Sequence, residues 1–176
     1  MRRYLPLLAL ALLVLSATAC KPAASGKTET AAGAANQLPW LAFDKALAQG
    51  SSDGKFVVVD FYTDWCHWCK VLDAKTYPDP AVQAAFAKSF ALAKVNPEKD
   101  NGPYQYKGRS VSGADLAKEF NVQGYPTSVF LDKDGNVCGQ FAGYVPPETY
   151  VKILDFIAAG DYKKQSLDDF IKGLPQ

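Results

Sequence analysis

The sequence contains few histidine and cysteine residues, and its charged residues give no large excess of either sign. Its 176 residues include one histidine and four cysteines, and its acidic and basic side chains nearly cancel to a formal net charge of +1. Such a balance, with both signs mixed along the chain, gives no indication of a nucleic-acid partner. After residue 20 no apolar run is long enough to cross a membrane. Length and composition therefore indicate one ordinary globular domain of about 140 residues from Leu38 onward, which is enough to bury a single core.

The N-terminus has the features of an export signal. Arg2 and Arg3 precede an apolar stretch over residues 5–15, and the small residues 17–19 form a cleavage site. We therefore expect residues 1–19 to be a signal peptide. This predicts an exported protein, and the resemblances described below imply the bacterial periplasm or cell envelope as its location.

Cys20 follows in a context that resembles a bacterial lipobox, in which the cysteine is lipidated and becomes the new N-terminus. Ala17 stands where leucine is most usual, so ordinary cleavage after Ala19 stays open. Residues 20–37 are rich in Ala, Gly, Ser and Thr without apolar periodicity, which is typical of a flexible linker. The expected organisation is a linker with Cys20 as a candidate lipid anchor, followed by one domain over residues 38–176.

Two cysteines, Cys66 and Cys69, lie between a predicted buried strand and a helical pattern. The apolar run 56–59 predicts the strand, and residues 71–72 begin the helical pattern. The start of a helix offers unpaired backbone N–H groups and the positive end of the macrodipole, which both favour a thiolate. We therefore expect a lowered pKa at Cys66, the more exposed residue. Cys69, one turn inside, is close enough to form a disulfide with it, so the pair is predicted to be redox-active.

Other roles for this pair are less well supported. A structural zinc site needs two further ligands, and His67, Cys138 and Cys20 do not form a second ligand pair. Covalent haem attachment needs a histidine directly after the second cysteine, where Lys70 stands. A purely structural disulfide stays open, because exported proteins retain disulfides. No metal or cofactor is expected, and Cys138, in a predicted strand, is expected to be a buried, inert thiol rather than a third redox partner.

Four segments, taken in order, resemble the thioredoxin superfamily. The similarity covers roughly residues 38–159, and it is greatest to bacterial envelope members, namely thioredoxin-like lipoproteins and the periplasmic C-terminal domain of the transmembrane thiol:disulfide interchange protein. The similarity to these envelope members in particular depends mainly on residues 76–82. The four segments are V-V-V-D-F with W-C-H-W-C-K (57–70), A-K-V-N (93–96), F-N-V-Q-G-Y-P-T (120–127) and F-L-D-K-D-G (130–135).

The resemblance implies an α/β thioredoxin fold, with a central mixed sheet flanked by helices. A helical pattern at residues 166–172 predicts a short C-terminal helical extension. Residues 97–111 are predicted to be a surface loop, either a specificity element or an inert insertion. Local patterns predict helices over 39–49, 66–75, 79–89, 112–120 and from 147 to a stop at Gly160, and strands over 55–62, 90–96, 128–131 and 137–141.

The resemblance also implies roles for four residues in thiol–disulfide exchange. Cys66 attacks a substrate disulfide, and Cys69 resolves the resulting mixed disulfide. Asp60 matches the buried acid that exchanges a proton with the resolving cysteine, and burial at a strand end favours its protonated form; a surface turn aspartate is the alternative. Lys94 matches the lysine beside that acid, although an edge-strand lysine with a solvated head is also consistent with its position.

Five further residues are candidates for substrate binding. Trp65 matches the tryptophan that shields the site, although simple packing is an alternative. His67 and Trp68 stand between the cysteines, where a histidine cation would stabilise the thiolate and make the disulfide more oxidising. The resemblance implies a cis Tyr125–Pro126 bond that faces the disulfide and presents backbone to an extended substrate.

Three functions therefore compete. A reductase that keeps envelope or cytochrome-maturation thiols reduced, supplied by a membrane electron donor of the thiol:disulfide interchange type, is favoured by the narrower resemblance and by Trp65 and Lys70. An oxidase or isomerase of the same fold is supported by His67, because histidine between the cysteines is a feature of oxidising relatives. A non-catalytic binding or chaperone module is the third. We expect a monomer in each case, and in the first two cases its substrates are protein disulfides or dithiols.

Overall fold

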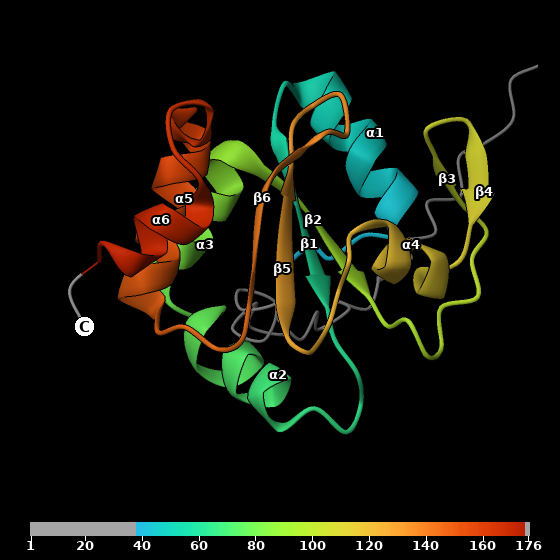
Figure 1. The fold of residues 1–176 in the computed structure, drawn as a ribbon, viewed down its shortest axis with the longest axis horizontal. Helices are drawn as coiled ribbons and strands as arrows, with labels where there is room; N and C mark the ends of the chain where they lie inside the picture. Colours follow the sequence, from blue (N-terminus) through green and yellow to red (C-terminus); the bar gives the residue numbers. More distant parts are fainter. Residues whose placement is uncertain (1–37, 175–176) are drawn as a thin grey trace, which may run out of the picture. The chain divides into compact units, whose positions relative to one another are not determined.

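The computed structural model describes residues 38–174, which are built around a four-stranded sheet in the order β2-β1-β5-β6 (Figure 1). β1 pairs in parallel with β2 and antiparallel with β5, which pairs antiparallel with β6. The mixed sheet that the sequence predicted is confirmed. The strands are β1 (Phe56–Phe61), β2 (Phe90–Val95), β5 (Thr127–Leu131) and β6 (Val137–Ala142).

Helices cover both faces of this sheet (Figure 1). Helices α1 (Phe43–Asp53) and α4 (Gly113–Glu119) bury apolar side chains against one face. Helices α3 (Pro80–Ser89) and α5 (Pro147–Ala158) do so against the other. Successive strand residues point to opposite faces, so Val57 and Val59 join the first core cluster and Val58 joins the second.

The first helix begins and ends later than the sequence predicted. Gly50, the predicted stop, lies inside α1, and a Cβ at this position would lie 2.7 Å from a methyl group of Val57 in β1. Gly50 therefore permits close helix–sheet packing, and the helix ends instead at Gly54, which has a left-handed backbone. The preceding residues are not helical; Leu41 forms an isolated parallel bridge with Ala93 in β2.

The helix predicted over residues 66–75 has two parts. Helix α2 (His67–Val71) continues directly into a π-helical turn, η1 (Leu72–Thr76), which was not predicted. The next helix begins as expected: the Asp79 carboxylate accepts hydrogen bonds from two backbone N–H groups, and Pro80 occupies the first helical position.

The surface loop predicted over residues 97–111 contains secondary structure that was not predicted. Strands β3 (Tyr104–Tyr106) and β4 (Arg109–Val111) form an antiparallel hairpin there. The two residues between the strands, Lys107 and Gly108, both have positive φ, as a tight hairpin turn requires. The rings of Tyr104 and Tyr106 pack edge-to-face against Phe43 of α1, which fixes the hairpin to the domain.

The chain after the hairpin follows the predictions closely. Ser112 and Asp115 form the expected capping box at the start of α4, and Gly160 follows α5 with a left-handed backbone. A 3-10 turn, η2 (Asp161–Lys163), leads to the expected C-terminal helix α6 (Leu167–Lys172). None of the helices within residues 38–174 has the length and hydrophobicity of a membrane-spanning segment. The predicted signal peptide and linker, including Cys20, lie outside the described residues.

Candidate active site

Cys66 and Cys69 form a disulfide at the N-terminal end of α2, with 2.09 Å between the sulfur atoms. Cys66 has an extended backbone and caps the helix. Its Sγ accepts a hydrogen bond of 3.0 Å from the backbone N–H of Cys69. This is the strand-to-helix geometry that the sequence predicted. A backbone donor directed at this sulfur favours its thiolate once the bridge is reduced.

The expectation that Cys66 is more exposed than Cys69 is wrong for the bridged protein. Both cysteines are 3% exposed, whereas the adjacent Trp65 is 67% exposed and Trp68 is 54% exposed. A bridged sulfur must point at its partner. Because Cys69 lies one turn inside the helix, the bond turns the sulfur of Cys66 away from solvent.

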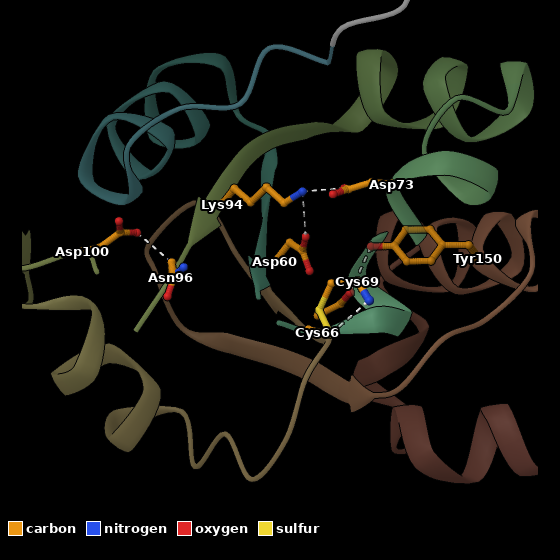
Figure 2. Close-up of polar contacts among 9 residues, drawn as sticks. Asp60, Cys66, Cys69, Asp73, Lys94, Asn96, Asp100 and Tyr150 are labelled. Atoms are coloured by element: carbon orange, nitrogen blue, oxygen red, sulfur yellow. Dashed lines mark hydrogen bonds and ion pairs between the residues drawn. A yellow bond between two sulfur atoms is a disulfide. The ribbon is translucent and has the colours of Figure 1, made fainter. Parts of the chain in front are cut away.

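Asp60 and Lys94 are brought together by the pairing of two neighbouring strands. They are direct partners in the parallel register of β1 and β2, and Lys94 Nζ lies 3.7 Å from Asp60 Oδ2. The Asp60 side chain is 1% exposed, which excludes the surface turn aspartate, and its Oδ1 atom has no hydrogen-bond partner. In Figure 2, Asp60 lies between Lys94 and the Cys66–Cys69 bridge.

Burial raises the pKa of Asp60 to about 7, against the opposing effect of the Lys94 ammonium. The carboxyl group is removed from water, and the charge of Asp73 disfavours its ionised form further. A carboxyl group with this pKa can both accept and release a proton near neutral pH.

Asp73, in the π-helical turn, completes this group of charges and was not predicted. Its carboxylate accepts a hydrogen bond from Lys94 Nζ, so the ammonium lies between a buried carboxyl and one that is 43% exposed (Figure 2). Nothing in the sequence around Asp73 indicates this pairing. It depends on the direction in which the π-helical turn presents the side chain, and such turns are frequent at functional sites.

Trp65 is held on one side of the disulfide by residues far away in sequence. Its indole N–H donates to the Glu98 carboxylate at 3.0 Å and 3.1 Å, and its ring packs edge-to-face on Tyr125. The Tyr125–Pro126 bond is cis, as the resemblance implied. The backbone N–H of Glu98 donates to the Asn96 side chain at 3.0 Å, which fixes the segment after β2. The sequence did not indicate that Glu98, within the 97–111 region, holds the Trp65 side chain in place.

Trp68 is held by a second aromatic contact that the sequence did not indicate. Its ring stacks on Tyr144, with centroids 5.5 Å apart and an interplanar angle of 25°. The His67 ring contacts Trp68 edge-on at 5.4 Å. The Thr76 hydroxyl donates to the Val145 carbonyl at 2.8 Å, so the loop that carries Tyr144 is attached to the end of the π-helical turn.

Cys138 lies in β6 and is half-buried rather than fully buried. Burial raises the pKa of its thiol to about 11, so the thiolate is scarce at neutral pH, which favours the inert role predicted for it over that of a third redox partner. Among residues 38–174, no group of three or more His, Cys, Asp or Glu side chains is arranged to hold a metal ion.

Replacing Glu98 by alanine is expected to release the Trp65 indole while leaving the fold intact, because the hydrogen bond is exposed. In a ¹H–¹⁵N spectrum, the indole N–H signal of Trp65 should move and broaden, while the signals of Trp40 and Trp68 stay in place. Glu119→Ala, which removes a surface ion pair with Arg109, is the matched control. An unchanged Trp65 signal in Glu98→Ala would show that Glu98 does not position the indole.

Comparison with known proteins extends the resemblance seen in the sequence. A family described as a thioredoxin-like domain matches residues 43–158, which include both cysteines, Asp60 and Lys94. The thiol:disulfide interchange protein DsbD of Haemophilus ducreyi is 32% identical over 109 residues, which are 62% of this chain and 16% of that protein. The chloroplastic thioredoxin-like protein HCF164 of Arabidopsis thaliana is 31% identical over 127 residues, 72% of this chain and 41% of that protein. The chain therefore spans less than half the length of either relative.

A solved structure supports the fold assignment independently. The thioredoxin from Thermus thermophilus superposes with a TM-score of 0.58 at 26% sequence identity. The superposition covers 73% of this chain and 93% of that one. The predicted thioredoxin fold is thus confirmed.

Proposed function

Because this chain belongs to the thioredoxin-like domain family and carries the redox cysteine pair of a thiol:disulfide oxidoreductase, we propose that it reduces protein disulfides in the bacterial envelope. The observation that carries this proposal is the hydrogen bond from the Cys69 N–H to the Cys66 sulfur. It favours one sulfur as the ionised nucleophile, and the second sulfur lies within bonding distance of the first.

Exchange proceeds in two steps, attack by Cys66 and resolution by Cys69. The Cys66 thiolate attacks one sulfur of the substrate disulfide; that S–S bond breaks, and the other substrate sulfur leaves as a thiolate that takes a proton from solvent. The Cys69 thiol then transfers its proton to the Asp60 carboxylate and attacks the Cys66 sulfur. The Cys66–Cys69 bond forms, the second substrate sulfur leaves, and two electrons have passed to the substrate. Asp60, with a pKa of about 7, can accept that proton and release it later.

Exposed and half-buried aromatic side chains around the pair supply a surface for an extended substrate segment. Trp65 and Tyr125 form one side of this surface, and Trp68 with His67 the other. Pro126 presents backbone beside the disulfide, as the resemblance implies. Apolar ring faces contribute contact area at a small entropic cost, which suits a site that accepts many protein substrates.

Re-reduction of the pair requires an electron donor, for which we propose a membrane protein of the thiol:disulfide interchange type. The similarity to such proteins supports this donor and the reducing direction. The signal peptide expected at residues 1–19 would direct export, and lipidation at Cys20 would then keep the domain at the envelope membrane. A monomer is sufficient for this chemistry, because both sulfurs and Asp60 belong to one chain.

An insulin-reduction assay tests the proposal. The wild-type protein should precipitate insulin chains in the presence of a dithiol reductant, and Cys66→Ser should not; Cys138→Ser is the matched control and should behave as wild type. The midpoint potential then gives the direction. A value near −270 mV, roughly that of thioredoxin, supports reduction, and one near about −120 mV would identify an oxidant. Absence of insulin reduction by the wild-type protein would instead support a non-catalytic binding module.

Replacing Trp68 by alanine is expected to raise KM for a protein disulfide about fivefold, with kcat little changed, because the ring contacts substrate but no reacting atom. Val137→Ala, which truncates an exposed side chain of β6, is the control and should leave KM unchanged. Steady-state kinetics with a disulfide-containing peptide makes the measurement. A kcat lowered about fivefold with an unchanged KM would contradict a role in binding.

A further inference from the structure

We propose that Trp40 is a positioning residue for the exchange reaction, because its ring holds the Lys94 ammonium beside Asp60. This inference rests on the proposed function, in which Asp60 takes the proton of Cys69. Trp40 lies outside the residues matched by the family, which begin at residue 43.

Three aromatic rings surround the Lys94 ammonium, and we call them the Lys94 cage. The Nζ atom lies 5.3 Å from the ring centroid of Trp40, 5.0 Å from that of Tyr62 and 5.8 Å from that of Tyr77. These distances lie within the range of cation–π attraction, to which tryptophan contributes most strongly among the aromatic residues. The cage leaves the Lys94 side chain 19% exposed.

The Trp40 ring is fixed from two directions. The next residue, Leu41, donates its backbone N–H to the Leu92 carbonyl in β2 at 2.9 Å, which attaches the segment to the sheet edge. The indole ring packs on Tyr77 with centroids 5.1 Å apart and contacts Phe86 edge-on at 6.5 Å. Trp40 is therefore a rigid wall of the cage.

A surface hollow of about 520 Å³ gives the cage its opening to solvent, and it is lined by Leu38, Pro39, Trp40, Asp73, Tyr77, Pro78 and Lys94. Within it, the Lys94 ammonium has two carboxyl partners. Its contact with buried Asp60, at 3.7 Å, is longer than its hydrogen bond with Asp73 at the surface. Without the Trp40 ring, the flexible lysine is free to turn toward solvent and Asp73. The contact with Asp60 is then the one that is lost.

The charges that face Asp60 fix the direction of the resulting change. Asp73 from the π-helical turn raises the pKa of Asp60, and Lys94 from β2 lowers it. Tyr77, after that turn, and Tyr150 of α5 have pKa values raised by burial, so both hydroxyls are neutral at pH 7. Moving the ammonium away therefore destabilises the Asp60 carboxylate and raises the pKa of Asp60.

A double-mutant cycle with direct titration of Asp60 tests this inference. The carbonyl absorption of protonated Asp60, assigned with Asp60→Asn, is followed by infrared difference spectroscopy against pH in the bridged protein. Lys94→Gln should raise the apparent pKa of Asp60 by about 1 or more, because it removes a cation within 4 Å. Trp40→Ala should raise it in the same direction by a smaller amount, and Trp40→Phe, which keeps a ring, should stay near wild type. Trp40→Ala should add nothing in the Lys94→Gln background.

Two results would overturn the role of Trp40. One is an unchanged pKa of Asp60 in Trp40→Ala, and the other is the same change with and without Lys94, which would mean that Trp40 acts through burial alone. Circular dichroism verifies that each variant is folded. Because the titration needs no substrate, it decides whether Trp40 positions Lys94 separately from the insulin assay, which decides the proposed function.

Discussion

Replacing Cys69 by serine is expected to trap protein substrates on Cys66 as a stable mixed disulfide and to lower turnover roughly 10³-fold or more. Attack by Cys66 needs only its own thiolate, which the backbone N–H of residue 69 still stabilises in the variant. Release of the mixed disulfide needs a second sulfur, which serine does not supply. Non-reducing gel electrophoresis and mass spectrometry of the adduct measure the trapping, and the insulin assay measures the turnover.

The matched variants assign the two steps to individual sulfurs. Cys66→Ser should lose turnover without accumulating an adduct, because the attacking atom is missing. Cys138→Ser should behave as wild type, with full turnover and no accumulated adduct, because burial makes that thiol a poor nucleophile. An adduct that accumulates on Cys69 in Cys66→Ser, to the level seen on Cys66 in Cys69→Ser, would reverse the assignment of nucleophile and resolving residue.

Asp60→Asn is expected to stabilise the bridged protein relative to wild type increasingly as pH rises from 4 to 8. In the unfolded chain Asp60 ionises with a pKa near 3.8, whereas in the folded protein burial raises its pKa to about 7. Between these values the folded state binds the additional proton, so wild-type stability falls with pH. The fall is complete above pH 7 and amounts to at most about 4 kcal/mol. Asparagine does not titrate, so the variant lacks this contribution.

Denaturant unfolding of both proteins across this pH range measures the difference between their free energies of unfolding. The contributions of all other groups cancel in this difference. Asp115→Asn is the matched control. Hydrogen bonds from Ser112 lower the pKa of Asp115 below its unfolded value of 3.8, so its contribution to stability changes mainly below about pH 4, and the difference from wild type should stay nearly constant from pH 4 to pH 8. A difference between wild type and Asp60→Asn that is constant from pH 4 to pH 8 would contradict a buried, protonated Asp60.

Much of the fold was predictable from local patterns, because the signals are physical and short in range. The apolar run before Asp60 gave β1, the capping residues Asp79 and Ser112 gave the starts of α3 and α4, and Gly160 gave the end of α5. The errors occurred where tertiary contacts override local preference. Gly50 was predicted to end the first helix, but it lies inside α1, where the lack of a side chain allows close packing on β1. The β3–β4 hairpin was missed because its short strands lie among polar and turn residues.

The candidate site was predictable to the extent that its residues carry chemistry in their own segments. Cys66 as a helix cap followed from the strand-to-helix transition, while the proximity of Asp60 and Lys94 came from the family resemblance. Asp73 and Glu98 were missed because their roles depend on a π-helical turn and on the path of the chain after β2. Each is an ordinary surface acid in the sequence, and only the three-dimensional structure shows what it contacts.

The pH dependence of alkylation at Cys66 tests most directly whether the backbone of α2 holds this sulfur as a thiolate. The reduced protein, with Cys20 and Cys138 replaced by serine, is treated with iodoacetamide at a series of pH values, and the modified cysteine is identified by mass spectrometry. We predict that Cys66 reacts first, with an apparent pKa below about 7.5. An apparent pKa near 8.5, the value of a free cysteine, would contradict the proposed mechanism.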